Sequence, residues 1–174
     1  QLPLDLGHRR AMGREDFLVS AANAEAVAWI DRWPDWQPPG IVLVGPPGCG
    51  KTHLGEVWRV RAHADYVRGE SLPASMVPPA ALVVDDAERA EERALLALYN
   101  TARAAGAWLL LTGPAAPARW NTRLPDLRSR LGTLPVVAIA PPDEALLTGV
   151  LLKHLADRQL SVPPEVITYL AARI

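Results

Sequence analysis

The chain has 174 residues and carries 18 Lys and Arg against 19 Asp and Glu, which gives a net charge of −1. This balance excludes a global electrostatic attraction to nucleic acid or to an anionic membrane. The single cysteine, Cys49, excludes an internal disulfide, and no apolar run approaches the ~18 residues that a membrane-spanning helix needs. The composition therefore predicts a cytoplasmic protein of one domain, or of one domain and part of a second.

The chain opens with the apolar hexapeptide QLPLDL, from Gln1 to Leu6. In an extended backbone Leu2, Leu4 and Leu6 project to one side, because successive side chains alternate. Such a segment either folds back as an edge strand or inserts into the groove of a partner. At ~0.8 kcal/mol per buried methylene, the leucines contribute several kcal/mol to docking, less the cost of ordering the chain.

Short apolar runs alternate with helix-forming segments through residues 23–139. Helices are predicted at Asn23–Trp33, Lys51–His63 and Ala87–Ala105, and strands at Ile41–Val44, Ala64–Val67, Ala80–Val84, Ala107–Thr112 and Pro135–Ile139. Apolar strands separated by helices are typical of a parallel sheet that is covered on both faces. The sequence therefore predicts an α/β fold with a five-stranded parallel core. Two further predicted helices, Asp143–Arg158 and Pro164–Ile174, follow a Pro-Pro pair as a small helical appendage.

Residues 45–52 read GPPGCGKT and match the phosphate-binding pattern G-x-x-x-x-G-K-[ST], with a predicted strand before it and a predicted helix after it. Glycines let backbone N–H groups curl around phosphates, and the helix N-terminus adds partial positive charge. Lys51 is expected to reach the outer phosphates and the Thr52 hydroxyl to ligate Mg²⁺. The alternative is a glycine turn that only joins strand to helix.

Two aspartates follow the apolar run of the third predicted strand. Asp85 is expected to be the carboxylate on the metal side, together with Thr52, and Asp86 is expected to polarise an attacking water. An alternative role for the pair is to cap the helix predicted from Ala87. The two roles are compatible, and a phosphate-binding loop requires a carboxylate partner of this kind.

The core resembles the DnaA branch of the AAA+ ATPases over nearly the whole chain. The resemblance rests on REDFLVSAAN, GPPGCGKTH, LVVDDAER, WLLLTG and LPDLRSRL, and QLPLDL looks like the peptide by which bacterial replication proteins bind the sliding clamp. A chain with both features resembles the Hda family of DnaA-related regulators. The resemblance implies an extended clamp-binding tail at residues 1–8, an AAA+ nucleotide-binding core at 9–140 and a partial helical lid at 141–174.

The resemblance also implies a ligand, partners and roles for individual residues. The ligand is ADP or ATP with Mg²⁺, and the partners are DnaA and the sliding clamp, which is the beta subunit of DNA polymerase III. Arg130 matches the family's arginine finger, which acts in the ATP site of a neighbour; without the resemblance it reads as a solvated arginine on a short helix. The nucleotide-lining residues are Val19, Gly45, Pro46, Pro47, Gly48, Cys49, Gly50, Lys51, Thr52 and His53, with Asn23 as a weaker addition.

Within this set, Cys49 also reads as a small filler and His53 as a local hydrogen-bonding residue. The clamp-binding residues are Gln1, Leu2, Leu4 and Leu6, although the same tail could dock on a second copy of the chain and form a homodimer.

The sequence departs from the DnaA pattern in three places. After the fourth strand it reads TGPAAPARW where DnaA-like chains have an acidic residue, which leaves Thr112 to sense the γ-phosphate and leaves hydrolysis at the protein's own site open. The sensor arginine of the family's lid would lie beyond Ile174. Residues 69–80 replace a helical element that the initiator uses for single-stranded DNA, so direct DNA binding is not expected.

Three functions compete on these grounds. The first is a clamp-tethered regulator that offers Arg130 to ATP-bound DnaA. The second is a replisome adaptor in which the nucleotide is structural and is not hydrolysed. The third is an ATPase that acts on DNA by itself, as a helicase loader or an initiator fragment does, and the near-neutral charge argues against it.

Overall fold

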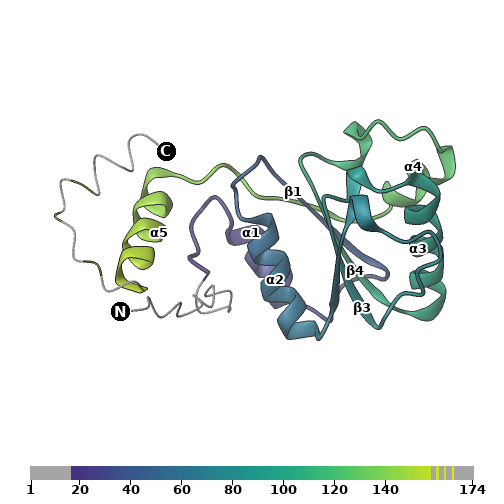
Figure 1. Cartoon of the computed structure of the whole chain (residues 1–174), viewed down its shortest axis with the longest axis horizontal. Coiled ribbons are helices and arrows are strands. Elements are labelled where there is room, and N and C mark those ends of the chain that lie inside the picture. Colours follow the sequence, from purple (N-terminus) through teal and green to yellow (C-terminus); the bar gives the residue numbers. More distant parts are fainter. Residues whose placement is uncertain (1–16, 158–159, 161–162, 164–165, 167–174) are drawn as a thin grey trace, which may run out of the picture.

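The computed structural model describes residues 17–157 together with residues 160, 163 and 166. The described part contains a parallel sheet of five strands in the order β2-β3-β4-β1-β5 (Figure 1). The strands are β1 (Gly40–Val44), β2 (Asp65–Arg68), β3 (Ala81–Asp85), β4 (Trp108–Gly113) and β5 (Val136–Ala138). Every strand pairing is parallel, so the predicted fold class is confirmed. Each predicted strand was placed to within about two residues of its observed bounds, because the apolar runs that mark a buried strand end where the strand does.

The described residues form five α-helices and three short 3-10 helices around the strands. The α-helices are α1 (Ala24–Asp31), α2 (Lys51–Ala62), α3 (Glu92–Ala105), α4 (Pro125–Leu131) and α5 (Glu144–Asp157), and the 3-10 helices are η2 (Gly69–Ser71), η3 (Ala87–Arg89) and η4 (Pro117–Arg119). Among the described residues, the connection from β2 to β3 contains only η2, in agreement with the short segment read from the sequence.

The helix predicted over residues 87–105 is divided in the structure. It begins as η3 and restarts at Glu92 as α3, whose N-terminus is capped by the Glu91 side chain through the backbone N–H groups of Arg93 and Ala94. Asp86 precedes η3 but its side chain makes no capping hydrogen bond. The suggestion that the aspartate pair caps this helix is therefore wrong, because Glu91 occupies the position where side-chain oxygens reach the free N–H groups.

Helices cover both faces of the sheet, with α1 and α2 on one and α3 and α4 on the other (Figure 1). Along β4, Leu110 faces the α1 and α2 layer, whereas Leu109 and Leu111 face the α3 and α4 layer. The central strands β1 and β3 are buried at every position. Because both faces are closed, polar groups of these strands meet solvent only at the strand ends, which places a functional site at the carboxyl edge.

The helix α5 extends beyond the sheet (Figure 1). Its N-terminus is capped by Asp143, whose side chain accepts a hydrogen bond of 2.7 Å from the Leu146 N–H. A Cβ atom on Gly149 of this helix would lie 3.2 Å from Leu18, so α5 contacts the segment that precedes α1. The predicted tail, residues 1–8, and nearly all of the helix predicted at 164–174 lie outside the described residues. In the part of the chain that is described, no helix has the length and apolar character needed to cross a bilayer.

Candidate nucleotide-binding site

The loop between β1 and α2 has the backbone geometry of a phosphate cradle. Gly48 and Gly50 have φ angles of 78° and 100°, which glycine adopts without the steric cost that a side chain would impose. At Gly45 a Cβ atom would lie 2.4 Å from the Ile139 carbonyl oxygen, so the loop approaches the residue after β5 more closely than a residue with a side chain would allow. Pro47, Gly48 and Thr52 are exposed, and this concave backbone therefore opens to solvent.

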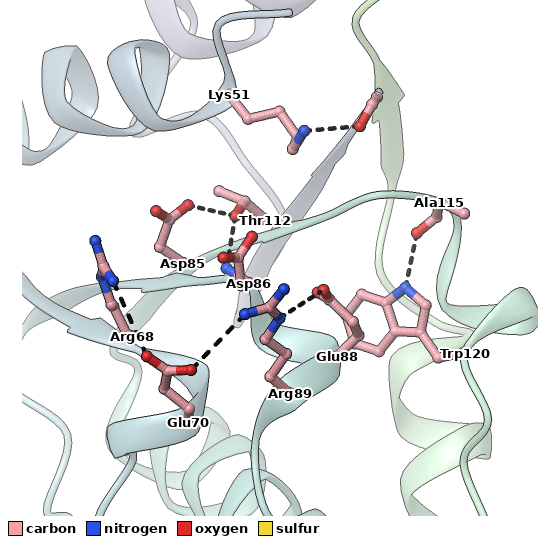
Figure 2. A network of polar contacts seen from close by, with 11 residues as sticks. Lys51, Arg68, Glu70, Asp85, Asp86, Glu88, Arg89, Thr112, Ala115 and Trp120 are labelled. Atoms are coloured by element: carbon pink, nitrogen blue, oxygen red, sulfur yellow. Dashed lines mark hydrogen bonds and ion pairs between the residues drawn. The ribbon is translucent and has the colours of Figure 1, made fainter. Parts of the chain in front are cut away.

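Lys51 begins α2 and folds back over the loop. Its Nζ donates hydrogen bonds of 2.7 Å to the Gly45 carbonyl and 2.9 Å to the Pro46 carbonyl, and Figure 2 shows the side chain directed at a loop carbonyl. These bonds hold an ammonium group over the cradle at the N-terminus of a helix of 12 residues. A phosphate bound here would meet the charge of Lys51 and the partial positive charge of α2 together.

Cys49 and His53 lie on the inner side of this region. Cys49 is buried, and its Sγ lies 3.8 Å from the Lys51 Nζ. The His53 ring packs edge-on against Phe17 at a centroid distance of 5.1 Å, and Phe17 is itself buried in the core. These contacts show both side chains packed against other residues of the protein. Their contact with a nucleotide stays a prediction.

Asp85, at the end of β3, accepts hydrogen bonds from three hydroxyl groups. Thr112 Oγ1 donates to its Oδ1 at 2.6 Å, and Tyr66 donates to its Oδ2 at 2.9 Å. Thr52 Oγ1 lies 3.1 Å from Oδ2 and 3.4 Å from Oδ1. The structure thus brings together Thr52 and Asp85, the two residues predicted to serve the metal, from positions 33 residues apart.

Tyr66 is a site residue that sequence reasoning missed. Burial raises the pKa of its phenol, and the hydrogen bond and the charge of Asp85 raise it further, against a smaller lowering by Arg68. The phenol is therefore protonated at neutral pH and acts as the donor. The sequence places a tyrosine in the second predicted strand. Its contact with Asp85 could not be predicted, because that contact depends on which strand lies beside it.

Thr112 and Asp86 form a second contact at the same edge (Figure 2). The Thr112 hydroxyl is fully buried, donates to Asp85 and accepts a hydrogen bond of 2.9 Å from the Asp86 N–H. This bond holds Asp86 in the left-handed region with a φ of 52°. Because both roles of the hydroxyl are used within the protein, Thr112 here positions the two aspartates. Its service as a γ-phosphate sensor, like the water-polarising role of Asp86, stays a prediction.

Glu88 is a further carboxylate close to the cradle. Burial raises the pKa of its carboxyl, as does the charge of Asp86, while the charges of Arg89 and Lys51 lower it. Figure 2 shows it between Arg89 and Trp120, at the end of a chain of contacts of 3.8–3.9 Å through Glu70 to Arg68. Arg68, Glu70 and Arg89 are largely exposed, so these pairs add little stability.

The residues predicted to contact the base and ribose lie before α1. Val19 is 52% exposed and is available to a ligand. Asn23 is 2% exposed and uses its amide in the turn, where it accepts from the Ser20 N–H and donates to the Leu18 carbonyl, both at 2.9 Å. In this structure Asn23 therefore stabilises the backbone that presents Val19.

Arg130 lies on α4, in the helical layer opposite to the layer that contains α2. Its side chain is exposed, and among the described residues it makes no hydrogen bond or ion pair. The chain entering α4 is fixed to α3, because the Glu92 carboxylate accepts hydrogen bonds of 2.8 Å from the N–H groups of Arg123 and Leu124. These two bonds lower the pKa of Glu92. Arg130 is thus an exposed residue on an anchored helix, in the layer opposite to the one that contains α2.

The donor set fits magnesium with a bound phosphate. Mg²⁺ prefers oxygen ligands and is usually held by one or two carboxylates, waters and phosphate oxygens rather than by a cage of protein ligands. Thr52 and Asp85 offer a hydroxyl and a carboxylate at the cradle, and the described residues contain no cluster of three or more His, Cys, Asp or Glu that could hold a metal without a phosphate. When bound, the ion would neutralise phosphate charge, and these two residues would hold it directly or through water.

No protein-family model matches this sequence. Among solved structures, a DNA replication initiation factor is 20% identical and superposes with a TM-score of 0.81, covering 92% of this chain and 59% of its own. Domain III of the Thermotoga maritima replication initiation protein DnaA is 19% identical, with a TM-score of 0.78 and coverage of 92% and 80%. AMPPCP-bound DnaA from Aquifex aeolicus is 21% identical, with a TM-score of 0.77 and coverage of 92% and 59%.

This protein has the fold of DnaA domain III. A RuvB protein of Thermotoga maritima is also similar, with a TM-score of 0.58, 16% identity and coverage of 78% of this chain and 49% of its own. At such identities the likeness establishes the fold and leaves the activity to be argued from the site. The chain spans 59% of the length of the replication initiation factor, so activities of that whole protein do not transfer by similarity.

The contact between Thr112 and the aspartates predicts a measurable loss of stability. Thr112→Val keeps the side-chain shape but leaves the Asp86 N–H without its acceptor and removes a donor to Asp85, so the free energy of unfolding should fall by about 1–3 kcal/mol. Thr101→Val is the matched control, because Thr101 is exposed on α3 and should stay within about 0.5 kcal/mol. Urea unfolding measures both, and equal losses would contradict the assignment.

Proposed function

We propose that this protein is a DnaA-related AAA+ regulator of the Hda type. It binds ADP or ATP with Mg²⁺, docks on the sliding clamp through its N-terminal peptide, and presents Arg130 to the nucleotide of a DnaA molecule. The observation that carries the proposal is the cradle, in which Lys51 lies over the loop and Thr52 faces the Asp85 carboxylate at 3.1 Å. A glycine turn that only joins strand to helix does not require a lysine, a hydroxyl and a carboxylate to converge.

Adenine nucleotide is the ligand best supported by the fold. A structure of similar fold, DnaA from Aquifex aeolicus, is bound to AMPPCP. The cradle supplies the elements that would bind the phosphates. Val19 offers an exposed apolar surface for the base. Nucleotide binding would order the segment around Val19, which contacts α5 through the neighbouring Leu18.

The action on DnaA rests on Arg130. An arginine finger stabilises charge on the transferring phosphoryl group and must therefore reach the site of a neighbouring subunit. The exposed guanidinium on α4, without a hydrogen bond or ion pair among the described residues, is in a state suited to that role. The Glu92 contacts to Arg123 and Leu124 fix the start of α4, so the arginine is presented from a rigid element.

The docking on the clamp rests on the sequence QLPLDL alone, since residues 1–6 lie outside the described residues. Insertion of Leu4 and Leu6 into an apolar groove would bury enough surface for a micromolar contact. This tether would keep the protein at replicating DNA without contacts of its own to DNA. The net charge of −1 and the short connection from β2 to β3 agree with such an indirect attachment.

The end of β4 favours a second candidate, an adaptor whose nucleotide is structural. The Thr112 hydroxyl donates a hydrogen bond to Asp85 and accepts one from the Asp86 N–H. The chain then continues from Gly113 through a turn in which the Trp120 indole N–H donates a hydrogen bond of 2.7 Å to the Ala115 carbonyl. Residues 113–120 contain no acid that could assist hydrolysis. An adaptor would show no turnover with clamp, DNA and DnaA all present, while nucleotide would still raise its melting temperature.

Nucleotide binding is tested by removing the lysine. Lys51→Ala should weaken ADP and ATP binding by at least about 10-fold, because hydrogen bonds to charged groups contribute about 1.5–3 kcal/mol. Calorimetry with Mg²⁺ present measures the affinity. Arg103→Ala, an exposed change on α3, is the control for loss of a positive charge. The absence of heat from the wild-type protein with either nucleotide would refute the proposal.

The trans-acting arginine is tested in a reconstituted DnaA ATPase assay. Arg130→Ala should return hydrolysis by DnaA to its unstimulated rate, since an arginine finger contributes ~10³ to 10⁵ in rate where it has been dissected. Arg123→Ala is the neighbouring control, because the bond from residue 123 to Glu92 uses the backbone N–H and survives the substitution. Full stimulation by Arg130→Ala would contradict the role.

The clamp tether is tested by gel filtration. Substitution of Leu4 and Leu6 by alanine removes six buried carbons at up to ~0.8 kcal/mol each and should weaken clamp binding by at least about 100-fold. The variant should therefore elute apart from the clamp. Arg130→Ala should co-elute with the clamp as the wild-type protein does. Unchanged co-elution of the leucine variant would eliminate this tether.

A further inference from the structure

Tyr66 stands at the edge of the sheet, beside the strand that bears Asp85. The register pairs Tyr66 with Val83 and Arg68 with Asp85, so Tyr66 projects from the same face of the sheet as Asp85. The diagonal neighbour on a face lies within reach of an aromatic side chain, and the phenol meets Asp85 Oδ2 at 2.9 Å. Tyr66 is 41% exposed, as is typical of this edge strand, and its hydroxyl nevertheless reaches the Asp85 carboxylate.

The Asp85 carboxylate is held from both neighbouring strands. Tyr66 comes from β2 and donates to Oδ2, and Thr112 comes from β4 and donates to Oδ1. Thr52 also donates, and as the predicted metal ligand it would direct a lone pair toward the ion and keep its proton for Asp85. Tyr66 and Thr112 are therefore the two hydroxyl donors to Asp85 that are not themselves predicted to ligate the metal.

We propose that Tyr66 is a positioning residue for magnesium, which fixes the Asp85 carboxylate in the orientation that serves the ion of a bound nucleotide. A carboxylate oxygen has two lone-pair directions, and with Tyr66 and Thr52 on Oδ2 and Thr112 on Oδ1, one direction of Oδ1 is left for a metal-bound water. Hydrogen-bond partners of this kind orient metal ligands and are worth 10–100-fold in metal affinity elsewhere. The inference rests on the proposed nucleotide site.

The first test measures metal affinity in the absence of turnover. In Tyr66→Phe, the affinity of the ADP complex for Mg²⁺ should fall about 10-fold. It is obtained by calorimetry from the Mg²⁺ dependence of ADP binding, and independently from Mn²⁺ binding by electron paramagnetic resonance. ADP binding in excess EDTA should be unchanged, because no phosphate contact is assigned to the phenol. Tyr99→Phe is the matched control, since the Tyr99 hydroxyl pairs with Thr133 at 2.9 Å in the opposite layer.

The second test is a double-mutant cycle with Asp85→Asn. If Tyr66 acts through Asp85, the phenylalanine substitution should change Mn²⁺ affinity about 10-fold in the wild-type background and much less in the asparagine background. Equal effects in both backgrounds would overturn the inference. So would an unchanged or tighter metal affinity in Tyr66→Phe, or an equal loss of ADP binding with and without metal, which is the signature of a merely structural role.

Failure of the inference and failure of the proposed function are distinguishable. If the wild-type protein binds ADP with a clear dependence on Mg²⁺ and Tyr66→Phe retains it, the role of Tyr66 is refuted and the nucleotide site stands. If the wild-type protein binds no ADP under either condition, the nucleotide site is refuted, and the role of Tyr66 falls with it.

Discussion

The hydrogen bonds to the Asp85 carboxylate are the interaction on which the arrangement of the site depends. They join α2, β2, β3 and β4 at one point, through Thr52, Tyr66 and Thr112. The sheet makes this convergence possible, because its central strands are closed on both faces and present polar groups only at their ends. Thr52 lies in the first turn of α2, next to Lys51, so its hydrogen bond to Asp85 joins the glycine-rich loop to this edge of the sheet. The loop and the Asp85 carboxylate are therefore held in a fixed position relative to one another.

The proposed ligand site and the proposed partner-contacting arginine lie in different helical layers. The layer of α1 and α2 contains the cradle, and the layer of α3 and α4 carries Arg130 on its outer surface. This separation suits a protein whose own nucleotide sets its shape while its arginine serves another subunit. In the proposed function, the near-neutral chain acts at DNA without contacts of its own to DNA, because the peptide QLPLDL provides the attachment.

Much of the fold was readable from the sequence because buried parallel strands have a distinctive pattern. The apolar runs located all five strands, and the spacing of Gly45, Gly50, Lys51 and Thr52 located the cradle. The division of the segment at residues 87–105 into η3 and α3 was missed, since both parts are rich in helix-forming residues and the capping role of Glu91 depends on local backbone geometry. Tyr66 was missed because its contact with Asp85 depends on strand order, which no local pattern encodes.

By itself, the sequence determined the fold class, the position of the glycine-rich loop between strand and helix, and the strand that ends in Asp85, because these follow from hydrophobic periodicity and from residue spacings within single segments. Only the tertiary structure decided which side chains meet. It placed Tyr66 and Thr112 on either side of Asp85, withdrew Asn23 into a turn, and set Arg130 in the layer opposite Lys51. The physical reason is that strand order and register fix contacts between residues far apart in the chain, and those are determined by the packing of the whole core.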